Sequence, residues 1–94
     1  MASEVTHHDN DERCEFVIER EGKRLARLNY ERSGNVVTIL HTEVDPELRG
    51  TGAGAKLVAA AVEWARDQQR QIMPLCSYAK AVFAKTPAYN DVLA

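Results

Sequence analysis

The sequence has few of the residues that commit a small chain to a special framework. Only two of its 94 residues are cysteines, Cys14 and Cys76, and they form neither a CxxC pair nor a Cys/His spacing. We therefore expect reduced thiols, no disulfide framework and no metal site. Aromatic residues make up only 6% of the chain and the formal net charge is -2. Both values disfavour a nucleic-acid binder, which needs stacking platforms or a basic face.

Long apolar runs are also missing. No stretch approaches the roughly 20 apolar residues of a membrane span, so we expect no membrane association. Residues 1–12 are polar and lack the apolar run of a secretory signal. We predict that they form a disordered tail in which His7 and His8 are solvated. Together with the reduced cysteines, this predicts a cytoplasmic protein. Residues 13–94 have room for one core, so we expect a single domain and a monomer.

What the sequence does contain is a two-residue alternation followed by a helical period. The alternation predicts strands, and Gly22 suggests a hairpin between the first two. Apolar residues at three- and four-residue spacings then predict one long helix. The expected elements are strands at 14–20, 25–31, 36–44 and 72–76, the long helix at about 52–69, and a short helix at 78–85. This order predicts an α+β fold: N-terminal antiparallel strands, a central strand, a long helix, a parallel strand reached by a right-handed crossover, and a short C-terminal helix.

The central strand, residues 36–44, is the most β-branched stretch of the chain and ends at Asp45-Pro46. Strict alternation would divide its side chains between two faces. One face would carry Val37, Ile39, His41 and Glu43, and the other Val36, Thr38, Leu40, Thr42 and Val44.

A glycine-rich loop, Arg49-Gly50-Thr51-Gly52-Ala53-Gly54, precedes the long helix. Glycines at a helix start leave the backbone N–H groups uncovered, and these donors and the helix dipole favour an anion. Arg49 and Lys56 add positive charge at the two ends of the loop. The Walker A pattern fails because Leu57 follows Lys56. A dinucleotide fingerprint is formally met, but its strand and acidic-residue context is missing.

The loop also satisfies the [QR]-x-x-G-x-[GA] motif of GNAT (GCN5-related N-acetyltransferase) proteins. The resemblance extends to the segment 41–50, to Leu57-Val58, to Pro74-Leu75-Cys76-Ser77-Tyr78 and to the segment 87–93. Over about half of its length the chain resembles the small GNAT-like, YjdJ-type family of acetyl-CoA-binding proteins. The resemblance implies a minimal GNAT fold and acetyl-CoA as cofactor. The residues expected to bind the cofactor are Val44, Arg49, Gly50, Thr51, Gly52, Ala53, Gly54 and Lys56.

Four residues are candidates for chemistry beside the thioester. The family resemblance offers Cys76 as an acetyl-accepting thiol, and a helix start at Ser77 would favour its thiolate form; otherwise Cys76 is a small buried side chain. Glu43, with His41 two residues before it, stands where GNAT enzymes commonly carry a general base on this strand. Both could instead be solvated polar residues. Tyr78 could protonate the departing coenzyme A or simply pack its ring.

Two functions remain open at this stage. The first is an acetyl-CoA-dependent N-acetyltransferase that acts on an unidentified small-molecule or peptide amine, either directly or through Cys76. The second is a non-catalytic acyl-CoA-binding module, because so short a chain has little room for an acceptor pocket. No motif in the sequence identifies the acceptor.

Overall fold

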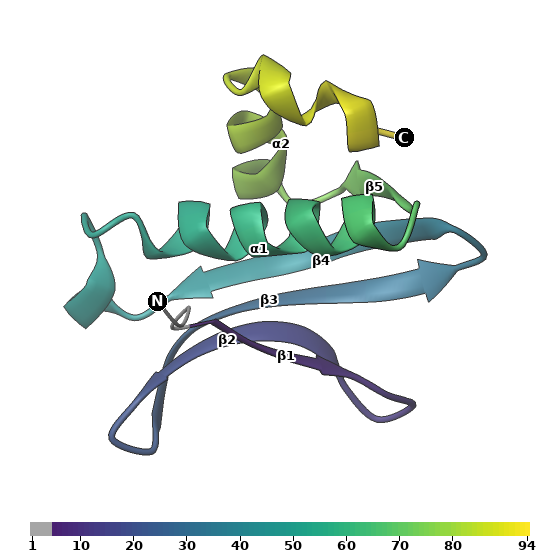
Figure 1. Ribbon diagram of the computed structural model, residues 1–94. Helices are drawn as coiled ribbons and strands as arrows, with labels where there is room; N and C mark the ends of the chain where they lie inside the picture. Colours follow the sequence, from purple (N-terminus) through teal and green to yellow (C-terminus); the bar gives the residue numbers. More distant parts are fainter. Residues whose placement is uncertain (1–4) are drawn as a thin grey trace.

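The computed structural model describes residues 5–94, which form one five-stranded sheet with helices against one face and at one edge (Figure 1). The strand order follows the chain, from β1 to β5. The first three strand pairs are antiparallel and the last is parallel. The bounds are β1 Val5–Asp9, β2 Cys14–Arg20, β3 Lys23–Ser33, β4 Val36–Val44, η1 Pro46–Leu48, α1 Ala53–Asp67, β5 Gln71–Pro74, α2 Ser77–Ala84 and η2 Pro87–Val92. The predicted α+β fold class is confirmed.

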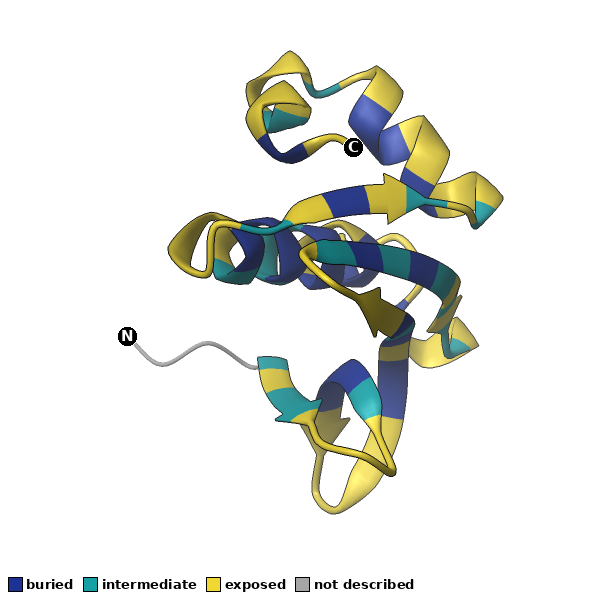
Figure 2. Cartoon of the chain, turned by 90° about the vertical axis from the view of Figure 1, so that its right-hand side faces the viewer, coloured by how far each residue is buried: buried dark blue, intermediate teal, exposed yellow. Residues whose placement is uncertain are grey.

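Helix α1 packs across the strands and supplies one side of the core. Its apolar stripe is fully buried and consists of Leu57, Val58, Ala61, Val62 and Ala65. This stripe meets buried side chains from the strands, among them Leu28, Ile39 and Ile72. Figure 2 shows the buried segments gathered where α1 meets the sheet. The face of the sheet that points away from α1 is called the outer face below.

Strand β1 was not predicted. The expectation of a disordered tail over residues 1–12 is wrong for Val5–Asp9, which pairs antiparallel with β2; residues 1–4 lie outside the described chain. The expectation that His7 is solvated is also wrong. Its ring stacks on Phe16 at 3.9 Å between centroids and meets the edge of Trp64 at 4.8 Å. Aromatic packing offsets the entropy of ordering this short polar strand.

A bulge in β4 changes which side chains face α1. Tyr30 pairs with Ile39, and Asn29, the residue before Tyr30 in β3, pairs with His41. Leu40 therefore has no partner in β3. An extra residue of this kind reverses the alternation that follows it. The prediction that Val37, Ile39, His41 and Glu43 share a face is therefore wrong. Before the bulge Val37 and Ile39 are buried, whereas after it His41 and Glu43 are exposed.

Strands β4 and β5 separate at the bulge. Their pairing ends at Ile39 and Pro74, where the Ile39 carbonyl oxygen accepts from the amides of both Leu75 and Cys76, at 3.1 and 3.2 Å. Strand β4 nevertheless continues to Val44. Within residues 5–94, the last part of β4 therefore has a strand partner in β3 only. Its other edge is open, beside the start of α2.

Candidate active site

The glycine loop lies between η1 and α1 and contains two left-handed backbone positions. Gly50 has φ 80° and Gly52, which precedes the first residue of α1, has φ 81°. Residues with a Cβ rarely adopt this conformation, so the turn requires glycine at both positions. Gly52 makes no side-chain cap, and the first turn of α1 contains no acidic residue. The sequence thus builds a helix start without the groups that usually satisfy its donors.

Some of the amide donors in this loop already have an acceptor within the protein. The Arg49 amide donates to the Pro46 carbonyl at 3.2 Å, and the Thr51 amide donates to the Leu48 carbonyl at 3.2 Å. The first bond into α1 runs from the Lys56 amide to the Gly52 carbonyl at 3.0 Å. Five amides in between have no acceptor in the described part of the chain: those of Gly50, Gly52, Ala53, Gly54 and Ala55. Together with the α1 dipole they form an anion site.

All of these residues except Ala55 line a cavity of about 310 Å³, which we call the loop cavity. Its wall is formed by Thr42, Val44, Leu48, Arg49, Gly50, Gly52, Ala53, Gly54 and Tyr78. Of the eight residues predicted to bind the cofactor, six are in this wall. The two others, Thr51 and Lys56, are exposed and not in the wall, and Thr51 turns its hydroxyl toward the Leu48 carbonyl. Leu48 and Thr42 were not predicted, because a buried leucine and a strand threonine have no distinctive pattern.

Tyr78, in the first turn of α2, forms the side of the loop cavity opposite the glycines. A Cβ placed on Gly54 would lie 2.7 Å from the Tyr78 hydroxyl oxygen and 2.8 Å from the adjoining ring carbon. The third glycine of the loop therefore allows the tyrosine to approach closely, and it has no special backbone angle. Tyr78 is 40% exposed and lines the loop cavity next to Gly54.

Cys76 caps the N-terminus of α2. Its sulfur accepts a hydrogen bond from the Ala79 amide at 3.3 Å and lies 3.3 Å from the Thr42 hydroxyl oxygen. Thr42 connects the cysteine to the loop cavity. The other cysteine has different surroundings, since the Cys14 thiol lies 3.6 Å from the Asn10 carbonyl oxygen and 3.9 Å from an Asp9 carboxylate oxygen. A developing negative charge on the Cys76 sulfur is stabilised by the Ala79 amide, whereas the Cys14 sulfur has these two oxygens and the Arg32 guanidinium as neighbours.

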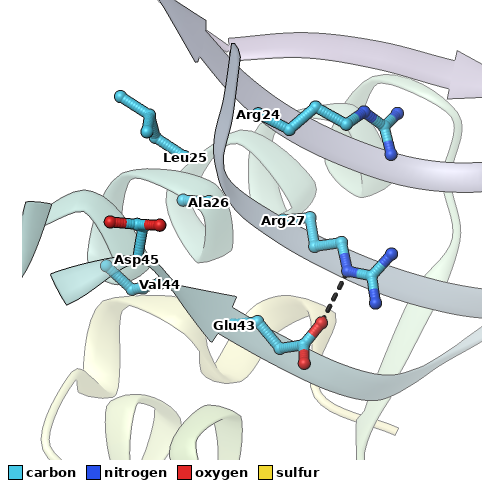
Figure 3. A pocket seen from close by; sticks show the side chains of 7 residues that line it. All are labelled: Arg24, Leu25, Ala26, Arg27, Glu43, Val44 and Asp45. Atoms are coloured by element: carbon cyan, nitrogen blue, oxygen red, sulfur yellow. Dashed lines mark hydrogen bonds and ion pairs between the residues drawn. The ribbon is translucent and has the colours of Figure 1, made fainter. Parts of the chain in front are cut away.

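Glu43 and His41 lie on the outer face, apart from the loop cavity. The Glu43 carboxylate accepts from Arg27 Nε at 2.6 Å (Figure 3). Glu43 and Arg27 line a second cavity of about 380 Å³, which we call the outer pocket. His41 is exposed and pairs with Asn29 across the β3–β4 ladder. The four candidates for chemistry thus fall on two sides of β4, with Tyr78 and Cys76 on the loop-cavity side and His41 and Glu43 on the other.

No helix within residues 5–94 is both long and apolar enough to cross a membrane. A family model described as GCN5-related N-acetyl-transferase matches residues 13–92. No curated protein is similar enough in sequence to count as a relative.

Solved structures with the same fold include a GCN5-like candidate N-acetyltransferase from Staphylococcus aureus. It is 36% identical with a TM-score of 0.77, over 97% of this chain and 87% of that one. A Mycobacterium tuberculosis protein in complex with CoA is 26% identical, with a TM-score of 0.63 over 78% of this chain and 46% of its own. A candidate streptothricin acetyltransferase from Bacillus anthracis in complex with acetyl-CoA is 19% identical, with a TM-score of 0.62 over 85% and 48%.

The chain thus spans most of the staphylococcal protein and about half of each of the other two. The family model covers nearly all of the described residues, and the glycine-loop motif forms part of the wall of the loop cavity. The chain belongs to the GCN5-related N-acetyltransferases, a family of acyltransferase enzymes.

Proposed function

We propose that this protein transfers the acetyl group of acetyl-CoA to an amine. The observation that carries the proposal is the set of four amides without acceptors in the loop cavity, at the positive end of α1 and beside Arg49. The first amides of a helix have no acceptor within the helix, and no side chain caps this one, so an anion bound in the cavity can accept from them. The diphosphate of acetyl-CoA fits this donor set. Family membership and the CoA complexes of two similar structures support the same assignment.

The open edge of β4 suits the pantetheine arm. Amide groups of a ligand can pair with strand N–H and C=O groups that have no neighbouring strand, as an added strand does. In this arrangement Thr42 and Val44, which line the cavity, would flank the arm. Its reactive end would point toward Cys76 and Tyr78, at the start of α2. Acetyl-CoA then supplies a thioester whose acetyl carbon accepts a nucleophile.

The remaining candidates have separate tasks in this proposal. Glu43 accepts the proton that the attacking amine loses, with His41 as the alternative acceptor on the same face. Tyr78 donates a proton to the departing sulfur. In a two-step route, Cys76 forms the new sulfur–acetyl bond first and passes the acetyl group to the amine afterwards. The cytoplasmic location and the monomeric state remain predictions.

Two measurements test the proposal. Calorimetry should show binding of both acetyl-CoA and free CoA, and a panel of amines should contain at least one that is acetylated over many turnovers. Tight binding without turnover on any amine would favour the alternative, a non-catalytic acyl-CoA-binding module. The absence of binding would contradict both.

The role of the general base has a test of its own. Glu43→Gln should lower the rate on the order of 100-fold with nearly unchanged acetyl-CoA affinity.

The two cysteines provide an internal control for the two-step route. Both are free and partly buried, but of the two it is Cys76 that contacts the wall of the loop cavity, through Thr42. Acetyl-CoA should therefore acetylate Cys76 in preference to Cys14, which peptide mapping by mass spectrometry would show. Equal labelling of both thiols would exclude the route through Cys76 while leaving direct transfer intact.

A further inference from the structure

The outer pocket contains charges of both signs that no part of the coenzyme site uses. It lies where β3 begins and β4 ends, and its wall is formed by Arg24, Leu25, Ala26, Arg27, Glu43, Val44 and Asp45. Figure 3 shows the guanidinium groups of Arg24 and Arg27 on the same side of the pocket, Asp45 on the opposite side and Glu43 between them. With a volume of about 380 Å³, the pocket has room for a small metabolite.

Arg24 and Asp45 are already engaged by the protein. Arg24 forms an ion pair with Glu15, a carboxylate that is only 3% exposed, and a second one with Glu19. Leaving the buried Glu15 charge unpaired would be costly, so Arg24 is held by the fold. Asp45 accepts from the Glu47 amide and so caps η1. The groups in the pocket that can change partners are therefore Arg27 and Glu43.

The Arg27–Glu43 pair is half-exposed and only partly saturated. The side chains are 46% and 61% exposed, and the contact joins Arg27 Nε to one carboxylate oxygen of Glu43. Figure 3 shows the two terminal nitrogens of Arg27 extending past the carboxylate. An exposed ion pair of this kind contributes little to stability. It can open for a ligand at small cost, provided that the ligand pairs both charges again.

The position of the pocket relative to the loop cavity suggests what that ligand is. Val44 lines both spaces, which lie on the two sides of the last part of β4. Glu43 points to the outer face, whereas its neighbour Thr42 lines the loop cavity. Because β4 has no strand partner on its β5 side beyond Ile39, the two spaces are separated there by a single strand edge. A nucleophile held at Glu43 is one strand-width from the open edge along which the thioester would lie.

On the basis of the proposed function, we infer that the outer pocket binds the acceptor and that the acceptor is a small amine that also carries a carboxylate, as an amino acid does. Its amine replaces Arg27 beside Glu43, and its carboxylate takes the terminal nitrogens of Arg27 in a bidentate contact. The number of ion pairs rises from one to two, and no charge is left unpaired. An amine without a carboxylate would leave Arg27 without its partner.

The transfer step balances with these groups. The amine nitrogen, after its ammonium proton has passed to solvent, forms a bond to the acetyl carbon as the bond from that carbon to the CoA sulfur breaks. Glu43 accepts the second proton from nitrogen, and the leaving sulfur receives one from Tyr78. The products are an N-acetyl amino-carboxylate and free CoA, and solvent restores the protonation of Tyr78 and Glu43. The acceptor carboxylate stays on Arg27 throughout and takes no part in bond making.

The test compares matched amines on the full chain. Each common amino acid is assayed beside the amine that lacks only its carboxylate, with saturating acetyl-CoA. At least one amino acid should be acetylated with a kcat/KM at least about 10-fold above that of its matched amine, which corresponds to one charge-assisted contact. Arg27→Gln should abolish this preference. Arg32→Gln is the control. Arg32 lies on β3, as Arg27 does, but its ion pair is with Asp9 of β1, away from the pocket. This variant should leave the preference unchanged.

A binding measurement separates failure of this inference from failure of the proposed function. NMR titration of the CoA-loaded protein with the preferred amino acid, or with the full amino-acid set in turn if none is acetylated, should shift the amide signals of Arg27 and Glu43. No such shift with any amino acid would overturn the inference, as would equal acetylation of every amino acid and its matched amine. Neither result affects the proposed function, which instead fails if CoA itself does not bind.

Discussion

The two ends of α1 satisfy their backbone groups in opposite ways. At the C-terminal end, the amides of Gln68, Gln69 and Arg70 donate to carbonyl groups of the last turns. Arg66 adds hydrogen bonds to both carboxylate oxygens of Asp91, at 2.8 and 2.9 Å, and this guanidinium lowers the pKa of Asp91. At the N-terminal end, five amides have no acceptor within residues 5–94.

Side-chain packing follows the same division. The Trp64 ring, near the C-terminal end, meets His7, Phe16 and Tyr30 at centroid distances between 4.8 and 6.0 Å, and Arg70 lies 5.4 Å from its ring centre. Near the N-terminal end the helix borders an open cavity. One end of the helix therefore contributes to stability, while the other retains unsatisfied donors that a ligand can use. Changes at the two ends should separate stability from binding.

The largest effect is expected from Gly52→Glu at the N-terminal end. A carboxylate in the loop cavity would repel the diphosphate and cover the amides, so the Kd for CoA should rise about 1000-fold or more. Calorimetry would measure it. Some loss of stability is also expected, because the side chain must adopt the left-handed conformation of Gly52.

Gly34→Glu is the matched control for that strain. Gly34 has φ 61° and open space around its Cα, like Gly52, but it lies in the turn between β3 and β4. The two variants should lose similar stability, and only Gly52→Glu should lose CoA. If both variants bound CoA as the unchanged protein does, the loop would not be the diphosphate site.

The second prediction concerns the C-terminal end, where Trp64→Ala should reverse the pattern. Removing a large, partly buried aromatic side chain from the cluster should lower the free energy of unfolding by about 2 to 3 kcal/mol. The CoA affinity of the folded protein should stay within about twofold, because the loop cavity does not include this residue. Urea unfolding and calorimetry give the two values. Glu63→Ala, next to it and exposed, should change neither by much.

The fold could be predicted wherever one segment carries its own periodic pattern. Helix α1 and strands β2, β3 and β4 have such patterns, and their order limits the topology to few choices. Strand β1 has no pattern of this kind. Of its two histidines His7 enters the aromatic cluster, and its ring contacts residues from three other elements, which a local pattern cannot reveal. The bulge at Leu40 was equally hidden, because it depends on the register between β3 and β4.

The candidate site divides along the same line. The loop was predictable because three glycines lie within one short segment at a helix start. Glycine is unfavourable in a helix, so such a cluster indicates a special role for the backbone. The outer pocket was not, because Arg27 alternates along β3 like any solvated residue. Its pairing with Glu43, sixteen positions further along the chain, arises only when the two strands align. Local chemistry is visible in a sequence, whereas chemistry assembled across strands requires the structure.

The smallest effect is expected from the pH response of the aromatic cluster at Trp64. Burial lowers the pKa of His7, while Asp9 opposes this shift. The neutral ring fits the site because its Nε2 can accept from the Tyr30 hydroxyl, 2.6 Å away, and burial raises the pKa of Tyr30 so that it keeps its proton. A protonated ring would place a charge among aromatic side chains and lose this acceptor.

The sign of the effect follows from linkage. A histidine whose pKa is lower in the folded than in the unfolded state leaves stability intact above the unfolded value of about 6.5, and stability is lost as pH falls from there toward the folded value. Between about pH 7.5 and about pH 5.5, the unfolding temperature of the unchanged protein should therefore fall more steeply than that of His7→Gln. His8→Gln should keep the steep response, because His8 is the strand neighbour that no aromatic ring contacts among the described residues. Parallel curves for the unchanged protein and His7→Gln would show that the cluster tolerates the charged ring, so that the C-terminal end of α1 would be less tightly packed than its contacts indicate.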